Sequence, residues 1–473
     1  MTRPKLARRL GALAAVAVTA GPLAPAASAQ DEPVPIPAFE ELRFDEDWST
    51  LALHERRIAR DRWLSWKYAP LTSDRLTWFS VGGSVRLRAE GTKERSFGAT
   101  PTGIVNEDAY LARLLLHGDL HVTRDARFFV ELRSAFVTGR DSEVDDRAVD
   151  ADSFDVQNAF FDASADFVPG VRGTVRVGRQ ELSIGSGRLV SPVDWNDVRT
   201  NFDAASLFLD AAGVEAVVWA ANEVPKDTDG IDQGDTDTHF FGGHVRWYDD
   251  DVALQAYLMN LDRPSVTVAG ESGDSQRTTV GIGANIPFLF GTRAEAEGAY
   301  QFGGVGDAEV RAFMYALSLE RDLTSSVKLR GAVSYASGDD AAGDGRVGTF
   351  DQLYADTHRY HGIIDLVGGQ NLVDFELGVD VRATSWLDLA LTGHRLVRAD
   401  KADTAYDVFG APILTAPSGS RAIGDEIDVE ARVRIAPFWT LQFGYGTLMA
   451  GDYAIDNGSD DVQFGYMSAS FVF

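Results

Sequence analysis

Several arginine side chains in the first third of this chain fall on one alternating face of the expected strands, where they could bind an anion together. One alternating set contains seven arginines, Arg86, Arg88, Arg113, Arg127, Arg133, Arg172 and Arg176, with four acids, Glu90, Asp119, Glu131 and Asp162. A guanidinium group binds a carboxylate or phosphate through two parallel hydrogen bonds. These arginines therefore predict a basic wall that favours anions. Alternatively, the same charges pair with one another across neighbouring strands.

Two further arginines, Arg179 and Arg188, lie in the stretch RVGRQELSIGSGRLVSPVDWNDVRTNFDA, residues 176–204. The stretch begins with strand-like alternation and then becomes rich in glycine. Its charged and aromatic residues interleave: Arg199, Asp194, Asp197, Asp203, Trp195 and Phe202. This pattern predicts a folded loop, which in a barrel would tuck inward and narrow the lumen.

The later part of the chain reverses the sign of the alternating charges. The acids there are Asp374, Glu376, Asp380, Asp388, Glu426, Asp428 and Glu430, against the bases Arg382, Arg432 and Arg434. If both sets face one lumen, its wall is basic on one side and acidic on the other.

Signals for catalysis or metal binding are weak. The spelling GDGRVG, residues 343–348, matches a dinucleotide motif but lacks the strand and helix that the motif requires. The same region resembles a calcium loop, yet Ala342 occupies a ligand position and Asp351 replaces the usual glutamate. The chain has no cysteine and no GxSxG motif. We therefore expect no enzyme activity, no cofactor and no metal site.

Alternation of apolar and polar residues predicts strands throughout the chain after Trp78. In SVRLRAE, for example, Val85, Leu87 and Ala89 oppose a polar face. About eighteen such strands are expected, an even number as bacterial barrels require. They span residues 78–90, 108–122, 126–138, 154–167, 171–181, 203–211, 214–223, 238–248, 251–260, 277–287, 291–302, 309–320, 324–336, 371–383, 386–396, 424–435, 438–449 and 461–473.

Three features favour a transmembrane antiparallel β-barrel over a soluble β-sandwich, which would show the same alternation. Tight turns alternate with long connections, as in outer-membrane barrels with short periplasmic turns and long extracellular loops. Aromatic residues lie near strand ends, where interface girdles form: Trp78, Trp247, Tyr248, Trp386, Trp439 and Tyr445. The third feature is an export signal combined with the terminal Phe473, as outer-membrane barrels have. No apolar run is long enough for a membrane-spanning helix, so a chain that meets a bilayer must do so as a closed barrel.

The ends of the chain indicate export and outer-membrane assembly. Residues 1–29 contain a basic segment, an apolar core and a small-residue cleavage site, as signal peptides do. Residues 30–77 would form a periplasmic leader and residues 78–473 the barrel. The terminal Phe473 predicts recognition by the outer-membrane assembly machinery. A net charge of −27 excludes nucleic acid as a partner.

Four segments resemble the outer-membrane alginate export family: LRFDEDWS, KYAPL, residues 176–204 and the terminal FGYMSASFVF. The resemblance spans the chain from about Phe44 and implies an 18-stranded barrel with a charged conduit for an anionic polysaccharide. We expect a passive outer-membrane channel for such a polymer or for smaller anionic solutes, in contact with outer-membrane lipid and lipopolysaccharide. The acidic loops would repel a polyanion and suit divalent cations instead. Alternatives are a nutrient-uptake porin, an outer-membrane hydrolase and a secreted carbohydrate-binding sandwich.

Overall fold

The computed structural model describes residues 37–94, 106–140, 148–228 and 230–473. Residues 39–473 form one compact unit. The predicted signal peptide, residues 1–29, lies outside the described residues. Within the described ranges, no helix is both long and apolar enough to span a membrane.

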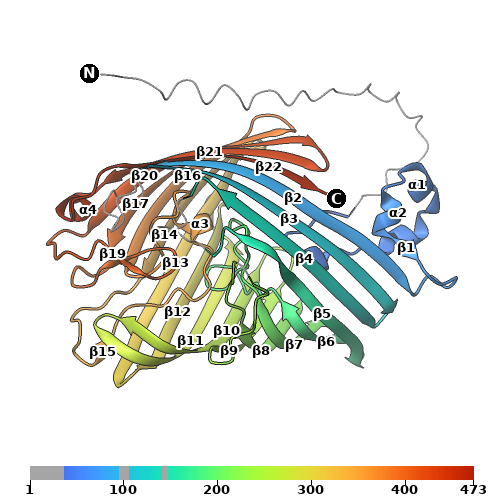
Figure 1. The fold of residues 1–473 in the computed structure, drawn as a ribbon, viewed down its shortest axis with the longest axis horizontal. Helices are drawn as coiled ribbons and strands as arrows, with labels where there is room; N and C mark the ends of the chain where they lie inside the picture. The colour runs from blue at the N-terminus through green and yellow to red at the C-terminus, as the bar shows by residue number, and fades with distance from the viewer. Residues whose placement is uncertain (1–36, 95–105, 141–147, 229) are drawn as a thin grey trace. The chain divides into compact units, whose positions relative to one another are not determined.

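Eighteen long strands form one antiparallel sheet that closes on itself (Figure 1). Closure occurs because β2 (Trp78–Lys93) pairs with both β3 (Asn106–Thr123) and β22 (Val462–Val472). The other long strands are β4 (Ala126–Thr138), β5 (Asp152–Val168), β6 (Val171–Gln180), β7 (Phe202–Ala211), β8 (Val214–Glu223), β9 (His239–Tyr248), β10 (Ala253–Val268), β11 (Glu271–Pro287), β12 (Arg293–Val305), β13 (Ala308–Thr324), β14 (Val327–Ala336), β16 (Leu372–Arg382), β17 (Leu387–Arg398), β20 (Ala422–Ala436) and β21 (Trp439–Ala450). The predicted all-β barrel of about eighteen strands is confirmed.

Short elements lie before and between these strands. The leader contains the 3₁₀ turns η2 (Arg43–Asp45) and η3 (Ser49–Leu53), the helices α1 (Glu55–Arg60) and α2 (Leu64–Lys67), and β1 (Ala69–Pro70). The connections contain η5 (Leu289–Gly291), β15 (Arg346–Val347), α3 (Thr357–Tyr360), β18 (Ala405–Tyr406), β19 (Pro412–Ile413) and α4 (Asp452–Asp456).

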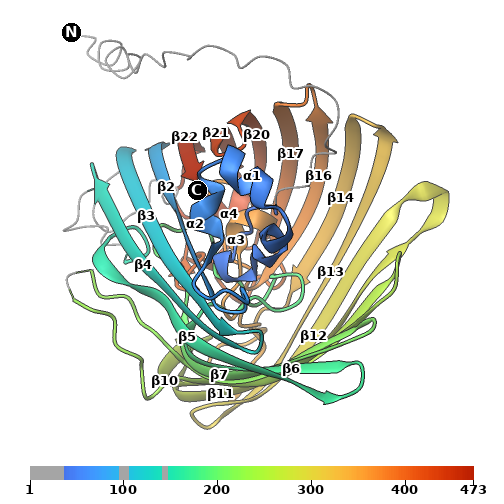
Figure 2. The same ribbon diagram turned by 90° about the vertical axis from the view of Figure 1, so that its right-hand side faces the viewer.

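The two ends of the barrel differ in their connections. At the turn end, strands are joined by residues 124–125, 169–170, 212–213, 249–252, 288–292, 325–326, 383–386 and 437–438. At the loop end, most connections are longer: residues 94–105, 139–151, 181–201, 224–238, 337–371, 399–421 and 451–461. Figures 1 and 2 show the leader helices at the turn end, whereas α4 lies at the loop end.

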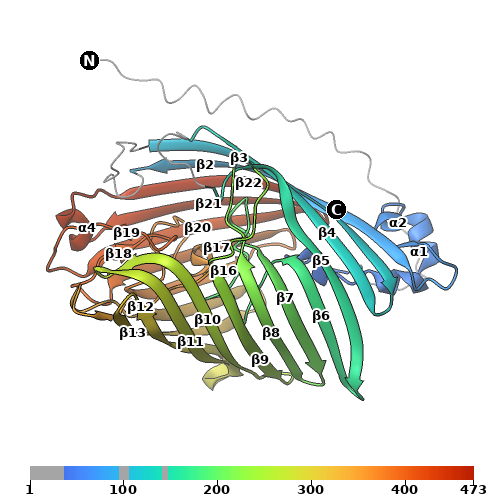
Figure 3. The ribbon, with the colours of Figure 1, turned by 60° about the horizontal axis from the view of Figure 1, so that its bottom comes forward.

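Two hairpins, β10–β11 and β12–β13, extend farther at the loop end than the sequence predicted (Figure 3). Residues 261–276 lie between the predicted strands 251–260 and 277–287 and were therefore expected to form a connection. Pro264 lies in this segment and cannot donate a ladder hydrogen bond. The structure accommodates Pro264 at an irregularity between Arg263 and Val266, where Ser265 has a φ of 55°. Pairing then resumes, because a bulge absorbs the extra residue without ending the strand.

The strand faces are reversed relative to those of a water-soluble protein. On β3, Leu114 and Leu116 are 45% and 42% exposed, whereas Arg113 and His117 are 6% and 3% exposed. The apolar side chains therefore point away from the barrel and the charged ones point into it. This arrangement requires an apolar medium outside, as lipid provides.

One predicted girdle residue is placed differently. Trp78 is buried inside the turn end, where it packs on Tyr68 and stacks on His121 at 3.9 Å between ring centroids. The leader supplies this inner packing partner, which alternation of the strand alone does not reveal. Trp247, Trp439 and Tyr445 are exposed, as expected of girdle residues.

Candidate functional site: a charged lumen crossed by two loops

Two connections fold into the lumen and join each other there. We call residues 181–201 and 350–366 together the partition. The backbone of Tyr354 donates to Leu189 O at 2.9 Å and accepts from Ser191 N at 3.0 Å. The Tyr360 hydroxyl donates to Ser186 O at 2.6 Å. The inward loop predicted from residues 176–204 is thus present, and a second loop completes it.

Trp195 lies at the junction of the partition with the barrel wall. Its ring stacks on His358 with centroids 3.8 Å apart, and the Arg88 guanidinium lies 4.0 Å from its centroid. His358 Nδ1 is 2.6 Å from Asp365 Oδ2. Burial alone would lower the pKa of His358, but the Asp365 carboxylate raises it more, so the pKa is above its ordinary value. The protonated imidazole therefore favours the stack.

The basic wall holds the first loop of the partition. Arg86 forms an ion pair with Asp197, and Arg113 Nη2 lies 2.9 Å from Asp194 Oδ1. Arg88 donates to Trp195 O at 2.6 Å. Burial would raise the pKa of Asp194 and Asp197, yet the surrounding arginines hold both pKa values below the ordinary value. These arginines therefore fix a loop through ion pairs and hydrogen bonds.

The acidic wall holds the second loop in a corresponding way. Glu426 accepts from the backbone N–H of Ile364 at 3.1 Å, and Asp428 accepts from that of Ile363 at 3.4 Å. Asp374 lies 3.1 Å from His361 Nδ1. The sequence predicted that the basic and acidic walls lie opposite each other, but only β21 and β22 separate β2 from β20, so the two walls lie on neighbouring parts of the barrel.

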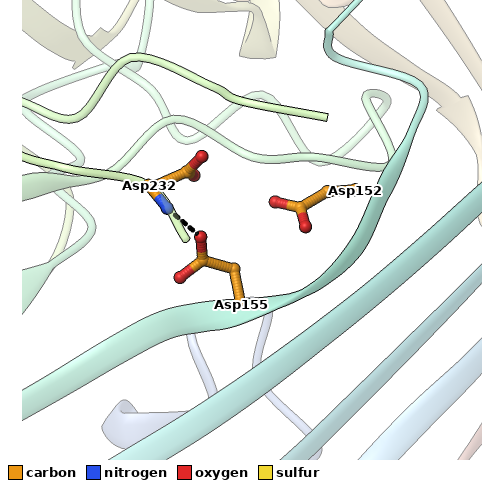
Figure 4. A group of neighbouring side chains, drawn as sticks. All are labelled: Asp152, Asp155 and Asp232. Atoms are coloured by element: carbon orange, nitrogen blue, oxygen red, sulfur yellow. Dashed lines mark hydrogen bonds between the residues drawn. The ribbon is translucent and has the colours of Figure 1, made fainter. Parts of the chain in front are cut away.

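Arg133 lies at the centre of a buried ionic cluster near the loop end. Figure 4 shows Asp152, Asp155 and Asp232 pointing toward one another, an arrangement that could hold a metal ion. Arg133, however, pairs with Asp152 and lies 2.9 Å from Asp232. Asp155 lies 3.5 Å from Arg179. Each carboxylate already has a cationic partner, so the cluster is an ion-pair network.

The remaining arginines singled out from the sequence also have partners. Arg127 pairs with Asp119 at 2.8 Å, Arg172 with Asp125 at 2.7 Å, and Arg176 with Asp162 at 2.8 Å. Arg188 lies over the ring of Tyr360 at 3.9 Å. Arg179 lies at the loop-end rim, bonded to Asp203 at 2.9 Å, on the strand face opposite inward-facing Gln180. The cross-strand pairing considered as an alternative is therefore extensive.

Two further arginines line the lumen: Arg330 was not identified from the sequence, whereas Arg432 was among the bases assigned to the later strands. Arg330 on β14 donates to Glu376 at 2.6 Å and to Asp380 at 2.8 Å, and so offsets the acidic wall. Arg432 on β20 lines a turn-end cavity and makes no hydrogen bond or ion pair with any described residue. The period-two pattern around Arg330 was a signal that could have identified it.

The leader enters the lumen from the turn end. The Phe44 ring lies edge-on to Phe129 and Phe160, with centroids 5.7 Å and 5.3 Å away, and the Arg176 guanidinium lies 4.5 Å from it. Arg127 donates to Phe44 O at 2.7 Å. Part of the basic wall is thus covered by the chain itself.

Among the described residues, four cavities lie along the lumen, and each has at least two arginines and at least three carboxylates in its lining. The loop-end cavity, about 430 Å³, is lined by Arg88, Arg140 and Trp195. Three turn-end cavities have volumes of about 590, 610 and 420 Å³. Their arginines are, respectively, Arg172 and Arg246; Arg382 and Arg432; and Arg124, Arg127 and Arg176. Residues of the partition line the loop-end cavity and two of the three turn-end cavities.

The chain matches a known protein family and is similar in fold to solved structures. The model of a family described as alginate export matches residues 77–465. Among solved structures, Pseudomonas aeruginosa OccD3 (OpdP) is similar, with a TM-score of 0.59, 12% identity and coverage of 86% of this chain and 93% of that one. P. aeruginosa OccK3 (OpdO) has a TM-score of 0.54, 13% identity and coverage of 83% and 95%.

A third similar structure is P. aeruginosa OpdK with vanillate, with a TM-score of 0.54, 10% identity and coverage of 83% and 98%. At these identities the likeness shows the fold. No curated protein matches the chain.

Proposed function

This chain belongs to the alginate export family of outer-membrane β-barrels, and from that premise we propose that it is a passive channel for anionic solutes. The cargo is an anionic, alginate-like polysaccharide or a smaller carboxylate. The observation that supports this proposal most is the presence of at least two arginines, beside carboxylates, in every one of the four lumen cavities. Successive guanidinium groups provide weak, repeated sites along which a carboxylate can pass.

The proposal includes an orientation and a division of the chain. Residues 1–29 are a signal peptide, residues 30–77 a periplasmic leader and residues 78–473 the barrel. The turn end faces the periplasm and the loop end faces outward, because short turns are periplasmic in barrels of this type. The outer-membrane assembly machinery recognises the chain through its terminal Phe473. The outer surface contacts lipid and lipopolysaccharide.

A nutrient-uptake porin is the second candidate. The partition, which divides the lumen into cavities of a few hundred Å³, favours it, since such spaces suit small solutes. OpdK, which shares the fold, was solved with the small carboxylate vanillate. In both candidates a carboxylate passes through the lumen, along the same arginine-lined cavities.

Flux through proteoliposomes distinguishes charge selection from simple sieving. Oligogalacturonates are expected to cross faster than neutral malto-oligosaccharides of the same length. Arg432→Gln should reduce the advantage of the anionic sugar, because this unpaired guanidinium lines a cavity. Arg321→Gln, a control at an exposed outward position at the turn end, should leave it unchanged. Equal flux of charged and neutral oligomers through the wild-type protein would refute the proposal. Passage of short uronates alone would favour the porin.

A further inference from the structure

The leader carries an exposed face that is both basic and aromatic. Arg56, Arg60 and Arg62 are exposed, and Trp66 is 66% exposed. We call these four side chains the leader face. They lie on and between α1 and α2, which Figure 2 shows at the turn-end mouth of the barrel. The leader face is therefore exposed at the end of the barrel through which a ligand from the turn side would enter.

The leader face is held rigidly against the barrel. Beneath it, Trp48, Leu51, Leu64, Tyr68 and Trp78 form a buried cluster. Trp63 packs edge-on against Phe438 of the β20–β21 turn, with ring centroids 4.9 Å apart. Arg75 donates to Ala52 O at 2.7 Å. The exposed side chains thus project from a fixed scaffold, which lowers the entropic cost of binding.

The arginines of the leader face are available, unlike most of those in the lumen. Arg56 and Arg62 form no ion pair with any described residue. Arg60 lies 3.4 Å from Asp61, but that carboxylate is already bonded to Arg57 at 3.1 Å. In a chain of net charge −27, this is a local excess of positive charge. A polyanion repelled by acidic surfaces elsewhere would be attracted here.

The combination of side chains identifies the class of ligand. Guanidinium groups bind carboxylates through bidentate hydrogen bonds. The exposed indole of Trp66 offers a flat apolar surface to the C–H face of a sugar ring, as amphipathic aromatics do at wet interfaces. A single small anion would bind weakly at an open surface, whereas a polymer engages several weak contacts at once.

We infer that the leader face captures a polymer of uronic acids at the turn end before it enters the lumen. This inference rests on the proposed function and gives the channel its entry site. With the turn end in the periplasm, the capture site lies on the side from which an exported polymer would enter the lumen.

Binding of oligogalacturonate to the purified protein in detergent tests the inference. Isothermal titration at low salt is compared for the wild type and the triple variant Arg56→Gln, Arg60→Gln and Arg62→Gln. The matched control is Arg311→Gln, Arg346→Gln and Arg421→Gln, which removes three exposed arginines at the loop end. Heat-modifiable migration in electrophoresis confirms that every variant is folded.

The leader variant should bind about tenfold more weakly, since three exposed ion pairs each contribute little. Trp66→Ala should also weaken binding, and the loop-end control should match the wild type. The inference is overturned if the wild type does not bind, if both triple variants weaken alike, or if neutral malto-oligosaccharide binds equally well. It is also overturned if the leader face binds only vesicles of phosphatidylglycerol.

Failure of the inference is distinguishable from failure of the proposed function. Ion selectivity in planar bilayers depends on the lumen, and the leader variant should retain it. A wild type that selects cations would refute the proposed function whatever the binding result. A wild type that selects anions but does not bind the polymer would refute only the capture site.

Discussion

At the scale of single residues, the ionic contacts of the lumen have a structural as well as a transport role. Arg86 and Asp197 are separated by 111 positions in the sequence, yet they form a buried ion pair that fixes the partition. Removal of one member of such a pair leaves the other charge buried without compensation. Substitution of these arginines therefore tests stability before it tests selectivity.

We expect Arg133→Ala to lower the free energy of unfolding by about 3–5 kcal/mol, because it strands the carboxylates of Asp152 and Asp232. Arg172→Ala is the control, since its side chain is 34% exposed and its pair with Asp125 should contribute only about 0–1 kcal/mol. Urea unfolding followed by tryptophan fluorescence in detergent measures both. Equal losses for the two variants would show that burial of Arg133 has no energetic consequence.

His358 should make the partition sensitive to pH. The pKa of His358 is raised in the folded protein, so its ion pair with Asp365 stabilises the partition. This stabilisation is fully present below about pH 6.5, the ordinary pKa of histidine, and is lost as the pH rises through the folded pKa. The groups facing it are Asp365, Asp356, Glu430 and Trp195. We expect single-channel conductance to increase over that window as the Trp195 stack loosens.

His358→Gln should remove the pH dependence, because glutamine does not titrate. His121→Gln, which alters a lumen histidine near the turn end, should preserve it. The same pH profile in all three proteins would assign the effect to another group.

At the scale of elements, the leader depends on one inserted side chain. Phe44 is 5% exposed and contacts two rings of the barrel wall. Phe44→Ala should weaken docking of the leader by about 3–5 kcal/mol, as for other buried phenylalanines. Leu53→Ala, at a position that is 85% exposed, should have no effect. Limited proteolysis measures release of the leader. Unchanged protection of Phe44→Ala would show that other contacts suffice.

The strands could be predicted from the sequence, whereas their contacts with loops could not. The alternation of apolar and polar residues around Leu114 and Leu116 indicates which strand face contacts lipid, because this pattern depends only on residues that are adjacent in the sequence. The fate of Arg86 depends on a loop more than a hundred residues away. The prediction that Trp78 belongs to the interface girdle was wrong for the same reason, because its packing partner Tyr68 lies in the leader. Alternation thus indicates which side chains share a strand face, but it does not reveal which loop or leader residues cover them.

At the scale of the whole molecule, the outer surface of the barrel must face lipid. Ile282 on β11 is 70% exposed and points outward. Ile282→Arg should reduce the folding free energy in phospholipid vesicles by about 2–4 kcal/mol if it lies near the bilayer centre. Asn285→Arg, an inward position on the same strand that lines a cavity, should be tolerated. Similar tolerance of both variants would be inconsistent with lipid contact on this face.

We propose that this barrel conducts anions through a lumen with arginines along its length. The zero-current potential across a planar bilayer, recorded with the purified protein in a potassium chloride gradient, tests this statement most directly. We predict a potential of the sign that marks preference for chloride. A preference for potassium, or insertion of the folded barrel without any conductance, would contradict it.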